Sequence, residues 1–174
     1  GQTVNVSSLS AFVNGNYEAF IGKIIPALTN KNIVMVCSRN AKMGNLPFNV
    51  VKDFRVGKNC IVNDHHLVDD VAKWIEKNNI SNHVFLFSAS SLSEVMIHKL
   101  FEKYDNNTYL DIGTTLHPFL GLDIARDYLR AYWGKFRHPD LLKKCNWLEM
   151  VYVVDNGRQY WDDILALRND PEIK

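Results

Sequence analysis

Hydrophobic residues in this chain alternate between short, nearly unbroken runs and longer stretches in which they recur with the period of an α-helix. A short unbroken run is typical of a strand that is buried on both faces, because a half-exposed strand alternates with polar residues. The runs predict strands at residues 33–37, 59–62, 84–87 and 108–112. The periodic stretches predict amphipathic helices at residues 17–28, 66–78 and 91–104.

Polar residues and a proline refine the boundaries of these helices. Ser91 and Glu94 have the spacing of a capping box, in which each side chain bonds a free backbone amide of the first turn. Asp64 precedes the helix at residues 66–78 and is predicted to cap it. Pro26 lies inside the first helix and lacks an amide hydrogen, so we expect it to kink or shorten that helix.

Strands and helices alternate along the chain, which predicts an α/β fold. Right-handed crossovers between such strands give a Rossmann-like, mostly parallel sheet with helices on both faces. The 174 residues, of which 47% are hydrophobic, suit a single domain. We expect residues 1–121 to form the α/β core and residues 122–174 to form a helical, aromatic-rich C-terminal cap. The aromatic residues of that cap either pack against the sheet or stack on a sugar ring.

Small polar residues follow two of the predicted strands at their carboxyl ends, where ligands bind in open α/β sheets. Ser88, Ser90 and Ser91 lie between a strand and a helix, where hydroxyls and free amides bind phosphate. The next strand ends in Asp111, Gly113, Thr114 and Thr115. This pattern predicts a nucleotide or phosphate pocket. The alternatives are that Ser91 only caps its helix and that Asp111 only bonds the amides of its own loop.

Charge and cysteine content exclude several classes of protein. The net charge is +1 and the basic residues are dispersed, so we expect no nucleic-acid partner. Cys37, Cys60 and Cys145 are odd in number and widely separated, which favours neither a disulfide framework nor a structural zinc site. No apolar run has the length of a membrane span, and no signal-peptide pattern is present. We therefore expect a cytoplasmic protein with no membrane span.

One stretch of the sequence resembles a known enzyme family. Residues 106–121 read Asn-Asn-Thr-Tyr-Leu-Asp-Ile-Gly-Thr-Thr-Leu-His-Pro-Phe-Leu-Gly and are followed by Arg126-Asp127-Tyr128. This stretch is similar to the signature of glycosyltransferases of the GT-D fold. That signature has a Tyr-Ile-Asp-Val-Gly-Ser strand end, an Asp-Pro-Phe-Leu turn and then an Arg-x-Tyr. The resemblance covers residues 11–132 and is most specific over residues 108–128.

The resemblance implies an enzyme that moves a sugar from a nucleoside-diphosphate sugar to a glycan or glycoprotein acceptor. Arg126, with Ser90 and Ser91 of the serine turn (residues 88–91), then neutralises the leaving diphosphate. Contacts to the donor come from Ser88, Gly113, Thr114 and Thr115. Asp111 orients the donor or a divalent metal, Mn²⁺ or Mg²⁺, whose binding depends on the nucleotide. His117 removes the proton of the acceptor hydroxyl group.

Two positions depart from the pattern of that family. The family has an Asp-x-Glu motif ahead of the first shared strand, whereas the only such motif here is Asp170-Pro171-Glu172, in the last five residues. His117 also stands where the family often has Asp, which changes charge and basicity near neutral pH.

Two other interpretations stay open. The sequence Leu110-Asp111-Ile112-Gly113-Thr114 is superficially similar to the strand–loop motif of S-adenosylmethionine methyltransferases, but only one glycine follows the aspartate. His117-Pro118 also interrupts the chain where a methyltransferase helix begins. The missing Asp-x-Glu motif keeps open a non-catalytic α/β module that binds a nucleotide sugar or a protein. Neither a G-x-G-x-x-G nor a P-loop sequence occurs, which disfavours dinucleotide enzymes and P-loop NTPases.

Overall fold

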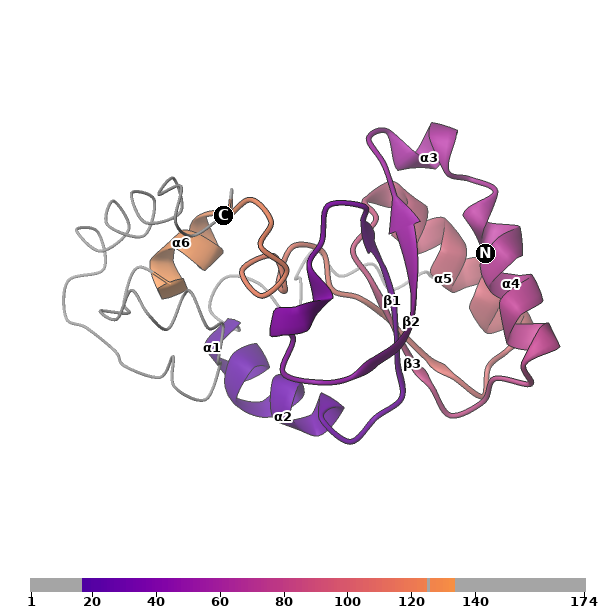
Figure 1. Cartoon of the computed structure of the whole chain (residues 1–174), viewed down its shortest axis with the longest axis horizontal. Helices are drawn as coiled ribbons and strands as arrows, with labels where there is room; N and C mark the ends of the chain where they lie inside the picture. The colour runs from indigo at the N-terminus through magenta and orange to yellow at the C-terminus, as the bar shows by residue number, and fades with distance from the viewer. Residues whose placement is uncertain (1–16, 125, 134–174) are drawn as a thin grey trace, which may run out of the picture.

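The computed structural model describes residues 17–124 and 126–133, and its centre is a parallel β-sheet (Figure 1). The strands are β1 (Ile33–Ser38), β2 (Val50–Val56), β3 (Val84–Phe87) and β4 (Thr108–Asp111). All neighbours pair in parallel, in the order β2-β1-β3-β4. β3 is buried throughout and β1 is buried except at its last residue, because these two strands lie at the centre of the sheet. The predicted α/β class with a parallel sheet is confirmed.

The second strand of the chain differs from the prediction. Residues 59–62 were expected to form a strand, but α3 (Cys60–Asn63) is a short helix there, and β2 lies upstream. Within the described residues β2 pairs only with β1, and most of its residues are partly solvated. Polar residues therefore interrupt its apolar pattern, as is typical of a strand at an edge. Asn59 enters α3 with a φ of 53°, a left-handed conformation that asparagine tolerates.

The N-terminal helix forms over residues 17–28 as predicted, and Pro26 alters its hydrogen bonding. α1 (Tyr17–Ala19) continues into the π-helical segment η2 (Phe20–Ile24) and then into α2 (Ile25–Leu28). Pro26 lies in the first turn of α2, where a missing amide hydrogen costs least. The expected disruption therefore takes the form of a π-helical segment ahead of the proline.

The connections between strands run across the sheet in two directions. α3 and α4 (Leu67–Lys77) link β2 to β3, and α5 (Ser91–Lys103) links β3 to β4. Both connections move across the sheet in one direction, whereas the connection from β1 to β2, which includes η3 (Met43–Asn45), moves the opposite way. Right-handed connections in opposite directions pack on opposite faces of a sheet. The strand order therefore reverses between β1 and β3, and open α/β sheets bind ligands beyond the carboxyl ends of strands at such a point.

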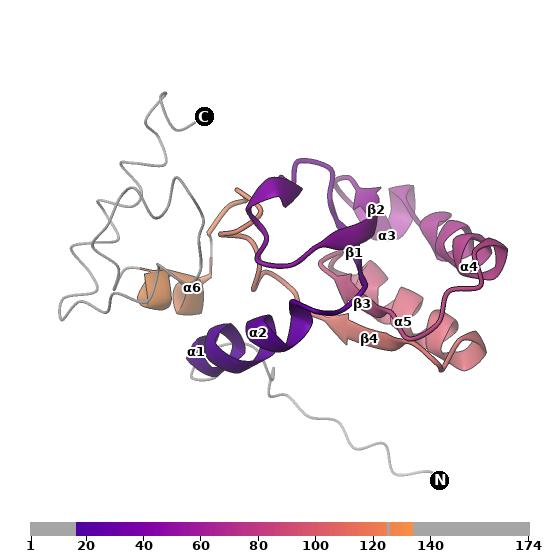
Figure 2. The same ribbon diagram turned by 60° about the horizontal axis from the view of Figure 1, so that its bottom comes forward.

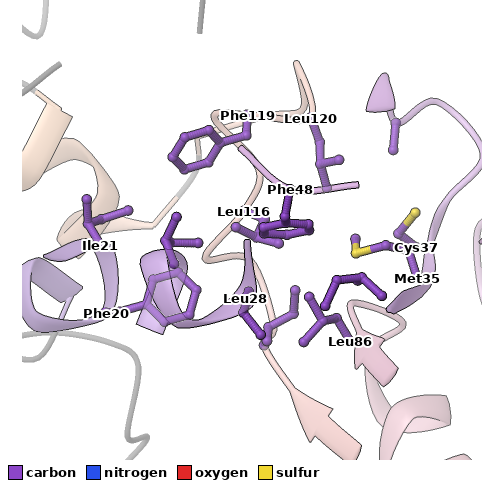
Figure 3. Close-up of a cluster of buried hydrophobic side chains, with 14 of the residues drawn as sticks. Phe20, Ile21, Leu28, Met35, Cys37, Phe48, Leu86, Leu116, Phe119 and Leu120 are labelled. Carbon is purple, nitrogen blue, oxygen red and sulfur yellow. The ribbon is translucent and has the colours of Figure 1, made fainter. Parts of the chain in front are cut away.

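Each face of the sheet has its own hydrophobic core. On one face, Val34 and Phe85 belong to the cluster that contains the buried sides of α4 and α5. On the other face, Met35 packs in a cluster with the N-terminal helix, the β1–β2 connection and the segment after β4. Figure 2 shows α1 and α2 on the opposite side of the sheet from α4 and α5. Figure 3 shows Phe48 and Leu116 between the N-terminal helix and β1. Helices on both faces of the sheet are thus confirmed.

α6 (Asp127–Trp133) follows the core and packs on the same face as the N-terminal helix. Its residues Leu129 and Trp133 are buried in that cluster. Residues 134–174 of the predicted C-terminal cap lie outside the described residues. No helix in the described ranges combines the length and the apolar character that crossing a membrane requires.

Two predicted helix caps are wrong. Ser90 takes the N-cap position of α5 and no side chain caps that helix, so the box of Ser91 and Glu94 does not form. A capping box requires its serine at the N-cap position, but Ser91 is already the first residue of the helix because the turn after β3 ends at Ser90. Ahead of α4, the Asp64 carboxylate instead accepts a hydrogen bond of 2.8 Å from the Gly57 amide, and α4 begins without a side-chain cap.

Candidate functional site

The predicted serine turn joins the end of β3 to the start of α5. The amide of Ser88 donates to the Val36 carbonyl of β1 at 2.8 Å, and Ser88 itself is half-buried. Ser90 and Ser91 are exposed at the start of the helix. Ser90 has a φ of 51° and a ψ of −146°, a strained combination for any residue other than glycine. The turn therefore presents two hydroxyls and the N-terminus of a 13-residue helix at the carboxyl edge of the sheet.

The loop after β4 has a fixed backbone and an exposed carboxylate. Asp111 Oδ1 accepts a hydrogen bond of 2.9 Å from the Gly113 amide, and Gly113 has a φ of 49°, which favours glycine. Thr115 is fully buried, and its hydroxyl donates to the Ile112 carbonyl at 2.8 Å. Its carbonyl accepts a hydrogen bond of 2.7 Å from the Tyr17 hydroxyl. The side chain of Thr115 thus holds the loop, whereas Asp111 and Gly113 lie on its exposed side.

The serine turn and the β4 loop are neighbours. Asp111 pairs with Phe87, the residue directly before Ser88, and the Ile112 amide donates to the Phe87 carbonyl at 2.9 Å. Although Asp111 is exposed, partial desolvation of its carboxylate raises its pKa, the Gly113 hydrogen bond lowers it, and the charge of Glu94 raises it further. Glu94 lies in the first turn of α5 and was not among the predicted site residues. The two loops therefore form one polar rim that contains a carboxylate with a raised pKa.

Arg126 is connected to this rim through its neighbour Tyr128. Thr114 Oγ1 and the Tyr128 hydroxyl share a hydrogen bond of 2.8 Å. Burial raises the pKa of Tyr128, while the bond from Thr114 and the charge of Arg126 lower it. Arg126 is exposed. The Arg-x-Tyr segment and the strand-end loop that precedes it are therefore adjacent in space.

His117 ends the same loop and is partly exposed. Its Nδ1 atom forms a hydrogen bond of 2.9 Å with the Asp123 carbonyl. Because a carbonyl only accepts, Nδ1 carries the proton in the neutral ring and Nε2 carries the lone pair. This tautomer has the basic nitrogen that a general base requires.

The strand order adds one residue that the sequence analysis did not assign to the site. Arg39 follows β1, is exposed, and donates its amide to the Val56 carbonyl of β2 at 2.8 Å. Its guanidinium group lies on Gly57, where an added Cβ would be 2.8 Å from Arg39 Cζ. Arg39 becomes a candidate site residue because β1 lies beside β3. This pairing is a property of the fold that the local sequence pattern does not predict.

Metal ligands are sparse at this edge. Residues 17–124 and 126–133 contain no group of three or more His, Cys, Asp or Glu side chains that could hold a metal ion. Asp111 and Glu94 are carboxylates, the kind of oxygen ligand that Mn²⁺ and Mg²⁺ prefer, but a hard cation needs further oxygens to complete its coordination.

Comparisons of the chain with protein-family models, with curated proteins and with solved structures found no match. The function proposed for the site therefore rests on its own residues and their arrangement.

Proposed function

We propose that this chain is a glycosyltransferase, or a domain of one, that transfers a sugar from a nucleoside-diphosphate sugar to a glycan or glycoprotein acceptor. The donor binds at the carboxyl edge of the sheet, between the serine turn and the loop after β4. The enzyme works in the cytoplasm, and the free thiols of Cys37 and Cys60 are in keeping with a reducing compartment.

The observation that carries this proposal is the hydrogen bond between Thr114 and Tyr128. It joins residues 14 positions apart and brings the segment of Arg126 to the loop that carries Asp111. The loop after β4 thus has hydroxyl groups and the N-terminus of α5 on one side, and the segment of Arg126, whose charge acts on Tyr128, on the other. This combination suits a diphosphate, which needs hydrogen-bond donors and positive charge together.

Six of the predicted residues have a role in sugar transfer. The leaving diphosphate gains negative charge as the bond to the sugar breaks, and Arg126, with Ser90 and Ser91, stabilises that charge. Asp111 orients the donor from the β4 side. His117 accepts the proton of the attacking hydroxyl on Nε2. Gly113 has no side chain, so the donor can approach the backbone of the loop closely.

A divalent metal, Mn²⁺ or Mg²⁺, fits this site only together with the nucleotide. Asp111 would hold the ion, and the diphosphate would supply the further oxygens that its coordination requires. The charge of Glu94 acts on Asp111, so a second carboxylate is close enough to add to the electrostatic attraction. When bound, the metal supplies positive charge that neutralises the leaving diphosphate.

Calorimetric titration with UDP, GDP, CDP, ADP and dTDP tests the proposal. We expect saturable binding of at least one of these nucleotides, transfer or hydrolysis of the matching nucleotide sugar, and no binding of S-adenosylmethionine. Binding of S-adenosylmethionine without a response to any nucleoside diphosphate would replace the proposal with a methyltransferase. Nucleotide-sugar binding without any turnover would identify a non-catalytic module.

A further inference from the structure

Arg39 lies on the β1 side of the point where the strand order reverses. β1 and β3 are neighbours, and the Ser88 amide donates to Val36 of β1, so the serine turn starts beside the end of β1. Arg39 directly follows the last residue of that strand. An anion bound at the serine turn would therefore have the loop of Arg39 next to it.

The backbone turn that carries Arg39 is held by a second arginine. Arg55 of β2 forms an ion pair with Asp53. Its Nη1 atom also donates to the carbonyls of Ser38 and Ala41, at 3.3 and 2.6 Å, on either side of Arg39. Because Asp53 compensates the charge of Arg55, Arg55 stabilises the backbone of the turn and is not the group that we expect to bind an anion. The position of Arg39 is thus fixed without a ligand.

The guanidinium group of Arg39 lies against the backbone of Gly57. A Cβ at Gly57 would be 2.8 Å from Cζ and 3.2 Å from Nε of Arg39, so a larger residue would displace the group. The Gly57 peptide is itself fixed by the hydrogen bond from its amide to Asp64. Arg39 forms no ion pair with any residue in the described ranges. An exposed guanidinium group without an ion-pair partner among these residues is suited to bidentate contact with phosphate oxygens.

The segment that supports Arg39 is joined to the serine turn. The thiol of Cys60, at the start of α3, donates to the Ala89 carbonyl at 3.0 Å. Ala89 lies between Ser88 and Ser90, and Gly57 lies just ahead of α3. Arg39 and the serine turn therefore belong to one connected rim at the carboxyl edge of the sheet.

We propose that Arg39 binds the phosphate groups of the ligand from the β1 side of the serine turn, and that Gly57 orients its guanidinium group. The identity of the ligand as a nucleoside diphosphate rests on the function proposed above, whereas the phosphate contact rests on the geometry of Arg39. The contact raises affinity for UDP and for inorganic pyrophosphate, and it leaves a nucleoside without phosphate unaffected.

Two variants and two matched controls test this inference. Arg39→Ala removes the guanidinium group, and Gly57→Ala displaces it without deleting it. Lys31→Ala removes a positive charge at the opposite end of β1, and Gly44→Ala adds a methyl group where no atom lies within 4 Å. Calorimetry with UDP, the other nucleoside diphosphates, uridine and pyrophosphate gives the affinities, and thermal melting confirms that each variant is folded.

We expect Arg39→Ala to weaken binding of the nucleoside diphosphate and of pyrophosphate by about tenfold to hundredfold, the usual effect of losing a charge-assisted contact. Gly57→Ala should weaken both ligands in the same direction, and the two controls should bind as the unmodified chain does. Equal affinity of the Arg39→Ala variant and the unmodified chain would overturn the inference while leaving nucleotide binding intact. Pyrophosphate binding that depends on Arg39, without binding of any nucleoside diphosphate, would uphold the inference and reject the proposed function. If the unmodified chain binds neither class of ligand, both are wrong.

Discussion

Tyr17 connects three distant parts of the chain through one hydroxyl group. The hydroxyl donates to the Thr115 carbonyl at 2.7 Å and accepts a hydrogen bond of 3.2 Å from the Trp133 indole. Tyr17 is 1% exposed, so water cannot replace these bonds without local opening. Tyr17→Phe removes the hydroxyl and keeps the ring, whose contacts with Phe20 and Tyr132 place the ring centroids 5.9 and 5.0 Å apart. The substitution therefore isolates the effect of the hydroxyl.

The expected cost follows from what the substitution leaves behind. The buried Thr115 carbonyl loses its donor, and a buried polar group without a partner costs about 1–3 kcal/mol. The hydrogen bond from the Trp133 indole is longer than the one to the Thr115 carbonyl, so its loss adds less to the free-energy cost. A domain of this size loses about 2–4 °C in melting temperature per kcal/mol. We also expect weaker nucleotide binding, because Thr115 holds the loop that carries Asp111.

Chemical denaturation of Tyr17→Phe beside Tyr104→Phe gives the measurement. Tyr104 also loses one hydrogen bond, of 2.7 Å to Glu76, but that bond is exposed. The control should therefore change the free energy of unfolding by no more than about 0.5 kcal/mol. If Tyr17→Phe is no less stable than Tyr104→Phe, the buried hydroxyl does not stabilise this part of the fold.

Four further predictions concern the site and the tyrosines. Partial desolvation raises the pKa of Asp111, so its ionised form opposes folding above that pKa. Because the carboxylate is exposed and solvent screens this effect, Asp111→Asn should raise the melting temperature at pH 7 only slightly, and it should abolish transfer. Arg126→Lys should lower nucleotide affinity by about 1–3 kcal/mol at unchanged melting temperature, since lysine lacks the bidentate fork; lower stability at unchanged affinity would make Arg126 a structural residue. Mn²⁺ should bind weakly by calorimetry until UDP or another nucleoside diphosphate is present, and tight stoichiometric binding to the nucleotide-free chain would contradict the proposed metal site. Burial raises the pKa of Tyr109 and Tyr132 to about 12, above the ordinary value of 10.0. The unfolded chain therefore loses these protons at a lower pH than the folded chain, and the melting temperature should fall as pH rises from 10 toward 12. A melting temperature that stays constant over this range would contradict the prediction.

The sequence predicted the strands at the centre of the sheet because full burial leaves a plain signal. β1 and β3 are continuous apolar runs, and the helices that follow the strands keep one apolar side. β2 was missed because Lys52, Asp53 and Arg55 stand in a strand that is only partly buried. The short apolar run at Cys60 was read as a strand because such a run fits one turn of helix equally well.

The candidate site could be predicted only where its residues are close in sequence to a strand end. Ser88 directly follows β3, and Asp111 is the last residue of β4. The hydrophobic pattern that predicts these strands therefore also predicts the two site residues. The role of Arg39 depends on β1 lying beside β3, and strand order is a long-range property that local patterns do not encode. The same holds for the contact of Tyr17 with the loop at Thr115, which joins residues 98 positions apart.

The two faces of the sheet differ in the sequence separation of the residues that pack on them. This difference predicts an order of folding. The buried cluster with α4 and α5 draws on residues 34–100, whereas the face with Tyr17 has hydrogen bonds across 98 and 116 positions. Contacts between distant residues form late because a long loop must first be closed. We therefore expect the loop after β4 to reach its final shape late in folding, when Tyr17, Thr115 and Trp133 meet. If the proposed site is correct, the chain should therefore bind its ligand only after residues 17, 115 and 133 have come together.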